Sequence, residues 1–467
     1  MLDIVFPIGT LFFFFQLKSP GSFFGLWKKS SIFSAHTFLF KVNNGESQAH
    51  SGKRCVGSIT KQEVKTDDEG QGRVNFNFPI LTIRTQLFTR VFDKLGSFRI
   101  SRLVSWAALF IVPFVAGIGL YLLLNSLLAL LWNPAAGDAA RQLGPAAYLL
   151  LPGINPVLPL LYGWLAIICA IAVHEGAHGV TARNLGLKVK SSGLLFFLFI
   201  PIGAFVDVDE EQLKKAKSKV SSRVMAAGVG ANTAVATVCL IGVLLIVSGL
   251  TPVIDGVYVY NVVDGMPAQA AGLLPRDVLV SIDNLRINST TELRVLLDNK
   301  TLGDIVPVTV ARGEMWQNQF STFVNLTVSE NRTAMGIGVG DLMTKERLSN
   351  YQTISPDRLS MYLVPPALAS GLVPFSDSLA PFYSHWLGTQ WQVWANVLFW
   401  LWFVNVNLAV FNALPIYPLD GGRMFNIALK SITRLREREK LTSGITLAVT
   451  AAVVFVLLMT VLIPFIT

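Results

Sequence analysis

Five runs of apolar residues constrain this chain more than any other feature of its sequence. A helix needs about 20 mostly apolar residues to cross the hydrocarbon core of a bilayer. Only 14% of the 467 residues are charged, whereas soluble domains carry about a quarter. The sequence therefore predicts an α-helical multi-pass membrane protein with about five to six transmembrane helices. The four clear runs are 103–132, 158–180, 224–250 and 441–466, and the fifth, 393–414, also contains four asparagines.

Lysine and arginine concentrate in alternate connections: before the first run, between the second and third, and before the last. Basic residues mark the cytosolic side of membrane proteins. Five spans with a cytosolic N-terminus reproduce this alternation and place the segment from residue 251 to about 391 outside the cytosol. The net charge of +9 is thereby explained, and no basic patch indicates a nucleic acid partner. The expected location is the plasma membrane in a prokaryote and an endomembrane in a eukaryote.

The segments between the apolar runs divide the rest of the chain. Residues 194–209 are apolar but too short to cross the bilayer twice. With Pro201 and Gly203 near their middle, they predict a β-hairpin embedded in the membrane. The expected domains are 1–82, a leader or tail; 83–102, a basic amphipathic segment on the inner membrane surface; 103–250, the first part of the membrane core; 251–345, an inserted domain; 346–390, a connector; and 391–467, the second part of the core.

The inserted domain is soluble in composition. Residues 257–262 and 306–312 are typical of strands, and 292–298 of a short helix. The sequence PAQAAGLLPRDVLVSID, residues 267–283, places a helix start, a glycine turn and an apolar strand in succession. This order resembles PDZ domains, so a small mixed α/β PDZ-like domain is expected. Another small fold with a helix-turn-strand unit is the alternative.

A His-Glu-x-x-His motif, formed by His174, Glu175 and His178, lies inside the second apolar run. On a helix, residues four apart share a face, so both imidazoles can reach one metal ion. The adjacent glutamate can then take a proton from a metal-bound water, as in zinc proteases. A charged residue at the centre of a bilayer costs about 3 kcal/mol. Metal ligation offsets that cost and gives the cluster a purpose.

Catalytic zinc sites use three protein ligands and a water, so a third protein ligand is needed. Asp420 is the best candidate. It lies in the sequence FNALPIYPLDGGR, where Pro415 and Pro418 interrupt regular helix at the end of a span. Gly421 and Gly422 allow close approach of the backbone. By the predicted topology, Asp420 and the histidine motif lie at the same membrane face.

HEGAH in one span, LDGG in a later span and a PDZ-like insertion between them together resemble the site-2 protease family of intramembrane metalloproteases. The resemblance covers about residues 103–467. It implies one zinc ion per chain, held by His174, His178 and Asp420, with Glu175 as the catalytic base.

Two asparagines also match positions of that family. Asn412, eight residues before Asp420, corresponds to a residue that holds the substrate backbone, and Asn232 resembles a further polar position near the site. Packing between membrane helices is the alternative role for both, because asparagine and small residues commonly join such helices.

The predicted function is therefore a zinc-dependent endopeptidase that cleaves transmembrane segments of membrane proteins and so releases membrane-tethered regulators. Its expected partners are membrane-protein substrates with a transmembrane helix and the lipid bilayer, and its oligomeric state stays open. One alternative is a membrane protease that uses a glutamate as third ligand and cleaves soluble or lipidated peptides. The other is a catalytically silent scaffold or transporter.

Overall fold

The computed structural model describes residues 74–86, 88–198, 200–329, 332–354, 359–432 and 438–466. Among these residues, five helices are long and apolar enough to cross a membrane, which confirms the five apolar runs. They are α4 (Arg99–Trp132), α6 (Leu160–Asn184), α8 (Ser218–Ser248), α12 (Trp391–Ala413) and α14 (Glu439–Ile466).

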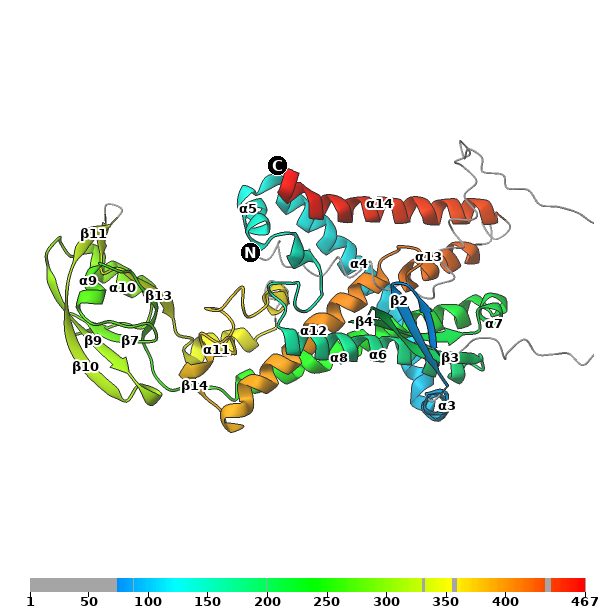
Figure 1. Ribbon diagram of the computed structural model, residues 1–467, viewed down its shortest axis with the longest axis horizontal. Helices are drawn as coiled ribbons and strands as arrows, with labels where there is room; N and C mark the ends of the chain where they lie inside the picture. The colour runs from blue at the N-terminus through cyan, green and yellow to red at the C-terminus, as the bar shows by residue number, and fades with distance from the viewer. Residues whose placement is uncertain are drawn as a thin grey trace, which may run out of the picture.

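The long helices lie side by side along the long axis of the molecule (Figure 1). Helix α8 is the central one, because it packs against α4, α6 and α12, while α14 packs against α4. Shorter helices flank the bundle: α5 (Pro134–Leu143) follows α4, α7 (Glu210–Lys215) precedes α8, and α13 (Asp420–Ser431) follows α12. The inserted domain lies at one end of the bundle, and a separate sheet lies near the other end.

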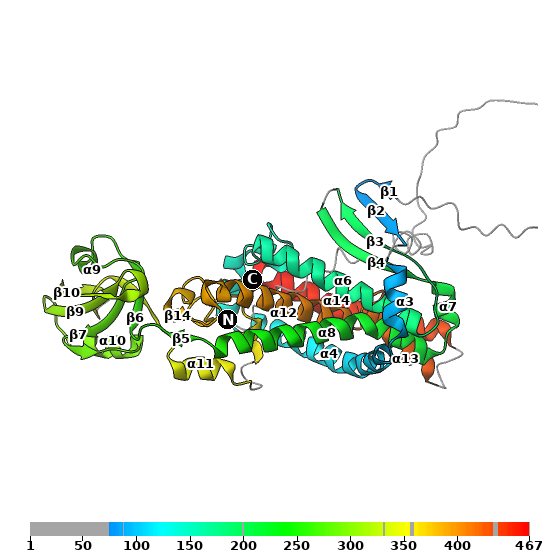
Figure 2. The same ribbon diagram turned by 90° about the horizontal axis from the view of Figure 1, so that it is seen from below.

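That sheet has four antiparallel strands in the order β1 (Val74–Asn77), β2 (Ile80–Thr85), β3 (Val189–Phe197) and β4 (Ile200–Val208). Residues 194–208 of the predicted hairpin thus lie in the hairpin of β3 and β4, which β1 and β2 extend. The two hairpin turns lie together, since the Leu198 N–H donates to the Pro79 carbonyl oxygen at 2.8 Å. Figure 2 shows the strands projecting from the side of the bundle beside α3 and α6.

The structure differs from the predicted boundary between residues 82 and 83, because β2 continues across it. Its sequence, ILTIRT, is rich in β-branched residues, and it pairs along its length with β3. The basic helix expected from residue 83 therefore begins later, as α3 (Thr89–Ser97). Residues 1–73, the rest of the expected leader, lie outside the described residues.

Helix α3 crosses the end of α6 that carries the histidine motif. Its Phe92 packs where a Cβ on Gly179 would lie, 2.9 Å away. Asp93 forms an ion pair with Arg183, and the Asn184 side-chain amide donates to the Gly96 carbonyl at 2.6 Å. These contacts fix the amphipathic segment against the bundle.

The inserted domain contains a sheet with the strand order β10-β9-β7-β6-β13, and β8 pairs with β7. The strands and the helix expected at 257–262, 306–312 and 292–298 are present as β6, β9 and α10, each within two residues of its expected limits. The elements are β6 (Val257–Val262), α9 (Pro267–Ala270), β7 (Val278–Ile282), β8 (Leu285–Arg286), α10 (Thr290–Asp298), β9 (Ile305–Arg312), β10 (Asn318–Asn325), β11 (Thr327–Ser329), β12 (Arg332–Ala334) and β13 (Ile337–Asp341).

The connector after this domain is a packed cap on the bundle. It contains α11 (Lys345–Gln352), and its Phe375 and Leu379 are fully buried in the same core cluster as α6, α8 and α12. The chain leaves the first part of the membrane core through β5 (Thr251–Pro252) and returns to the second part through β14 (Tyr383–Ser384). These two strands pair with each other.

Candidate metal centre

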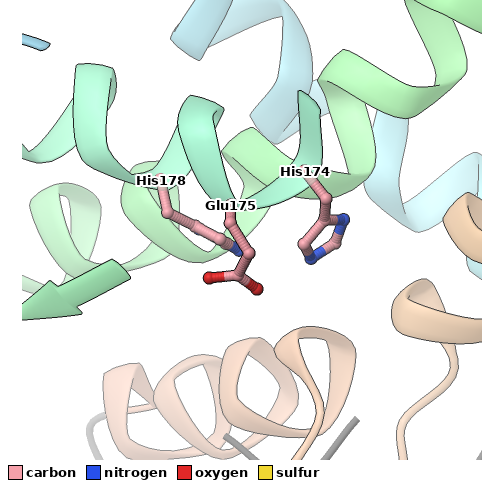
Figure 3. Close-up of side chains that lie close together, drawn as sticks. All are labelled: His174, Glu175 and His178. Carbon is pink, nitrogen blue, oxygen red and sulfur yellow. The ribbon is translucent and has the colours of Figure 1, made fainter. Parts of the chain in front are cut away.

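The side chains of His174, Glu175 and His178 leave the same side of α6 (Figure 3). All three are buried, with at most 4% of their surface exposed. From α13, Asp420 completes the group: its Oδ2 lies 3.1 Å from Nε2 of His174 and 3.0 Å from Nε2 of His178. The chain thus brings together residues 246 positions apart in the sequence.

The LDGG sequence places Asp420 through the two glycines that follow it. Helix α12 ends at Ala413, and α13 begins at Asp420 itself. A Cβ on Gly421 would lie 2.1 Å from the Ala413 carbonyl oxygen, and one on Gly422 would lie 2.3 Å from the Ile416 carbonyl carbon. Any side chain at either position would push α13 away from the turn before it and carry Asp420 out of the site.

Helix α8 orients His178 and packs against both imidazoles. The Nδ1 of His178 lies 2.7 Å from the Val224 carbonyl oxygen. Because a carbonyl only accepts hydrogen bonds, Nδ1 carries the proton and Nε2 keeps its lone pair for a metal. One turn further, a Cβ on Gly228 would lie 2.6 Å from Nε2 of His174 and 2.7 Å from Nε2 of His178. Only a glycine leaves room for the two imidazoles here.

The donors present fit a zinc ion. Two imidazole nitrogens and one carboxylate oxygen form a ligand set typical of catalytic zinc. Zinc bonds of about 2.0 to 2.1 Å at tetrahedral angles set neighbouring donors about 3.3 Å apart. The distances of 3.0 and 3.1 Å between Asp420 and the two histidines are close to that value. One donor each from Glu175 and the two histidines also lie within 4.8 Å of one another.

Glu175 is held by the sheet. Its Oε2 accepts a hydrogen bond of 3.1 Å from the backbone N–H of Val206, a residue of β4. Because β4 is the last strand of the four-stranded sheet, its outer edge faces α6 and the metal centre. Sequence reasoning missed Val206 and Val224, because both act through backbone groups and their side chains give no sign of that role.

The two asparagines predicted near the site are both buried but differ in their hydrogen bonds. The Asn412 amide donates to the Leu408 carbonyl of its own helix at 3.0 Å, as Asn405 and Asn407 do to their own preceding turns. Asn232 lies four residues after Gly228 and therefore on the same face of α8. Neither polar atom of its side chain has a hydrogen-bond partner among the described residues.

His385 lies at the opposite end of the bundle from the metal centre, directly after β14. Its Nδ1 accepts a hydrogen bond of 3.0 Å from the Leu387 N–H. Its ring packs beside Trp386 and Trp391. Burial lowers the pKa of His385.

The model of peptidase family M50 matches residues 162–355 and 364–459, more than half of the chain. An uncharacterized protein of Methanocaldococcus jannaschii is 25% identical over 74% of this chain and 76% of its own length. A Clostridium perfringens protein that carries the provisional name of zinc metalloprotease is 25% identical over 59% of this chain and 89% of its own.

Two further similarities are partial. The membrane-bound transcription factor site-2 protease homolog of Arabidopsis thaliana is 25% identical over 35% of this chain and 31% of its own. Among solved structures, the PDZ domain of an SdrC-like protein from Listeria monocytogenes is similar at 27% identity and a TM-score of 0.17. That similarity covers 18% of this chain and 88% of the solved domain.

Proposed function

Because this chain belongs to peptidase family M50 and is a zinc metalloprotease with transmembrane helices, we propose that it cleaves peptide bonds within the transmembrane segments of other membrane proteins. One observation carries the proposal: Asp420 lies within 3.1 Å of Nε2 of both His174 and His178. Three ligands from two distant helices then surround one buried position inside the helical bundle.

In this proposal His174, His178 and Asp420 hold the zinc ion, one per chain. When bound there, zinc supplies a water of lowered pKa and polarises the scissile carbonyl. Glu175 takes the proton from the attacking water on its carboxylate and returns it to the leaving amine. The Val206 N–H holds that carboxylate in place through its bond to Oε2, and the His178–Val224 bond fixes the imidazole tautomer.

The outer edge of β4 is the proposed binding site for an unwound substrate. A transmembrane helix hides its carbonyls in hydrogen bonds, so cleavage requires an extended segment with replacement partners. An unpaired strand edge supplies them by adding the substrate as a further strand. The edge of β4 suits this role because it passes beside Glu175. Asn412 and Asn232 are proposed to bind the substrate backbone near the metal.

We place the tip of the four-stranded sheet within the bilayer. Three large apolar side chains at this tip are exposed: Phe78 and Leu198 in the two turns are 80% and 40% accessible, and Phe76 at the end of β1 is 58% accessible. Such a cluster on a sheet edge is a liability in water but matches lipid. Within the hydrocarbon, a sheet edge needs a partner for its backbone, and an extended substrate provides one.

We propose that the metal centre lies toward the cytosolic face and the inserted domain outside the cytosol, an orientation that the basic connections favour. The inserted domain then filters substrates, by excluding bulky ectodomains or by admitting already trimmed chains. Cleavage of the remaining transmembrane segment would release its membrane-tethered regulator toward the cytosol.

The test compares wild type with Glu175→Gln on a reconstituted transmembrane substrate, with the new termini mapped by mass spectrometry. Wild type is expected to cut inside the predicted span, and the variant to keep its zinc while losing cleavage by about 100-fold or more. Equal cleavage by both proteins would favour the silent scaffold. Cuts confined to soluble segments would favour the protease that acts on soluble or lipidated peptides.

A further inference from the structure

A small apolar pocket lies between α6 and α12, close to the metal centre. Ile167, Ala170 and Ile171 line it from α6, while Leu408 and Phe411 line it from α12. Ala170 and Ile171 precede His174 by four and three residues, so they share the face of α6 that carries the histidines. With a rise of 1.5 Å per residue, the three lining residues of α6 lie about 4 to 11 Å along the helix from His174, on the side toward the inserted domain.

The pocket is also close to the asparagine proposed to hold the substrate. Leu408 accepts the hydrogen bond of the Asn412 amide, and Phe411 precedes Asn412 directly. The one polar lining residue, Asn407, donates its own amide to the Phe403 carbonyl at 2.7 Å. With that amide engaged, the remaining lining is aliphatic or aromatic.

The size of the pocket limits what can enter it. The free space between the lining atoms holds about one water molecule, which is close to the size of a methyl group. Ala170, which is fully buried, forms part of the wall. The pocket therefore suits a methyl-sized apolar group, and a charged or long side chain would need its walls to move apart.

We propose that this pocket receives the side chain of the substrate residue next to the scissile bond and restricts it to small residues such as glycine and alanine. The inference rests on the proposed function, because it needs an extended substrate whose carbonyl lies at the metal. In such a segment alternate side chains point to opposite sides, and the one directed between α6 and α12 meets the pocket. Ala170 then determines specificity without taking part in the chemistry.

The experiment uses substrates that differ only at the two residues flanking the mapped cleavage site, each carrying Gly, Ala, Val or Leu. At one flanking position, wild type is expected to cleave the Leu substrate at least about tenfold less efficiently than the Ala substrate, as measured by kcat/KM. Ala170→Gly enlarges the pocket and is expected to reduce that difference. Ala170→Val fills it and is expected to shift the preference toward Gly.

Ala409→Val is the matched control. Ala409 is as buried as Ala170 and lies on α12, but it packs toward α4 and α8 in another core cluster. This variant should keep the wild-type ranking of substrates, whatever its effect on the overall rate. If Ala170→Val does not fold, the relaxed preference of Ala170→Gly still tests the proposal.

The same ranking of substrates in wild type and in a folded Ala170 variant would overturn the assignment of the pocket. So would a wild-type enzyme that accepts Leu and Ala equally at both flanking positions. Failure of the proposed function has a different signature, because wild type and Glu175→Gln would then give the same fragments from every substrate.

Discussion

Replacing Gly228 by alanine tests whether α8 closes the metal centre as the structure shows. The added Cβ would lie 2.6 Å from Nε2 of His174 and 2.7 Å from Nε2 of His178, whereas ordinary contact begins at 3.4 Å. Each ring would have to retreat by about 0.7 to 0.8 Å to restore that contact. Helix α8 cannot simply withdraw, because Gly230 on its other side packs tightly against Ala108 of α4.

The expected loss of zinc affinity follows from the small displacement of its ligands that a metal site tolerates. Zinc–ligand distances are held within about 0.2 Å of their usual values, so displacements several times larger break or distort both nitrogen bonds. Disturbing the groups that orient a zinc ligand costs about 10-fold to 100-fold in metal affinity. With two ligands displaced, Gly228→Ala is expected to weaken zinc binding by at least about 100-fold and to reduce cleavage in parallel.

The assay measures zinc content of the purified protein and zinc affinity by competition with a chelator, together with cleavage of the transmembrane substrate. Gly176→Ala is the matched control, since Gly176 lies within the histidine motif itself and a Cβ there would meet no described atom within 4 Å apart from its chain neighbours and the backbone of its own helix. The control should bind zinc normally. Full zinc occupancy and unchanged cleavage in Gly228→Ala would refute the close packing of α8 on the two imidazoles.

Three further substitutions test single contacts of the site. Asp420→Ala removes the one ligand from α13 and should abolish stoichiometric zinc binding in metal analysis; retained zinc would exclude Asp420 as a ligand. Val206→Pro deletes the N–H that Glu175 accepts, so zinc should remain while kcat falls by about tenfold or more; an unchanged kcat would show that this bond does not orient the base. Asn232→Leu replaces a buried amide that has no hydrogen-bond partner in the described part of the chain by an apolar group of similar size, so thermal stability should hold or rise while cleavage falls by about tenfold; unchanged cleavage would assign Asn232 to helix packing.

The sequence predicted the membrane helices and the residues that meet at the candidate metal centre, because those features are local or chemically rare. Each span needs about 20 consecutive apolar residues, a pattern visible without any knowledge of packing. His174, His178 and Asp420 were proposed as ligands because the two histidines interrupt such a run and because Asp420 is followed by a glycine pair. The structure then gives the reason for that pair, which is the contact of α13 with the turn after α12.

The sheet was only half predicted, since its other half depends on pairing between distant segments. Strand β2 pairs with β3 across more than 100 residues of sequence, and no periodicity within residues 74–85 indicates that partner. The backbone groups that orient the site were equally hidden. Val224 and Val206 contribute a carbonyl and an N–H, so their side chains carry no sign of the role. Gly228 lies in the small-residue sequence AAGVGANTA, a composition common at contacts between membrane helices, but the sequence does not show which side chains pack against it.

The distribution of the site over the chain makes metal binding depend on assembly of the bundle. His174 and His178 come from α6, their support comes from α8, and Asp420 arrives on α13 only after the inserted domain has been passed in the sequence. No short segment contains all three proposed ligands, so zinc affinity should include the free energy of packing these helices together. A substitution at a helix contact such as Gly228 should therefore lower zinc affinity even though it changes no ligand. Conversely, bound zinc should stabilise the contact between the two halves of the membrane core, since it favours the assembled state over any state in which α13 has separated from α6.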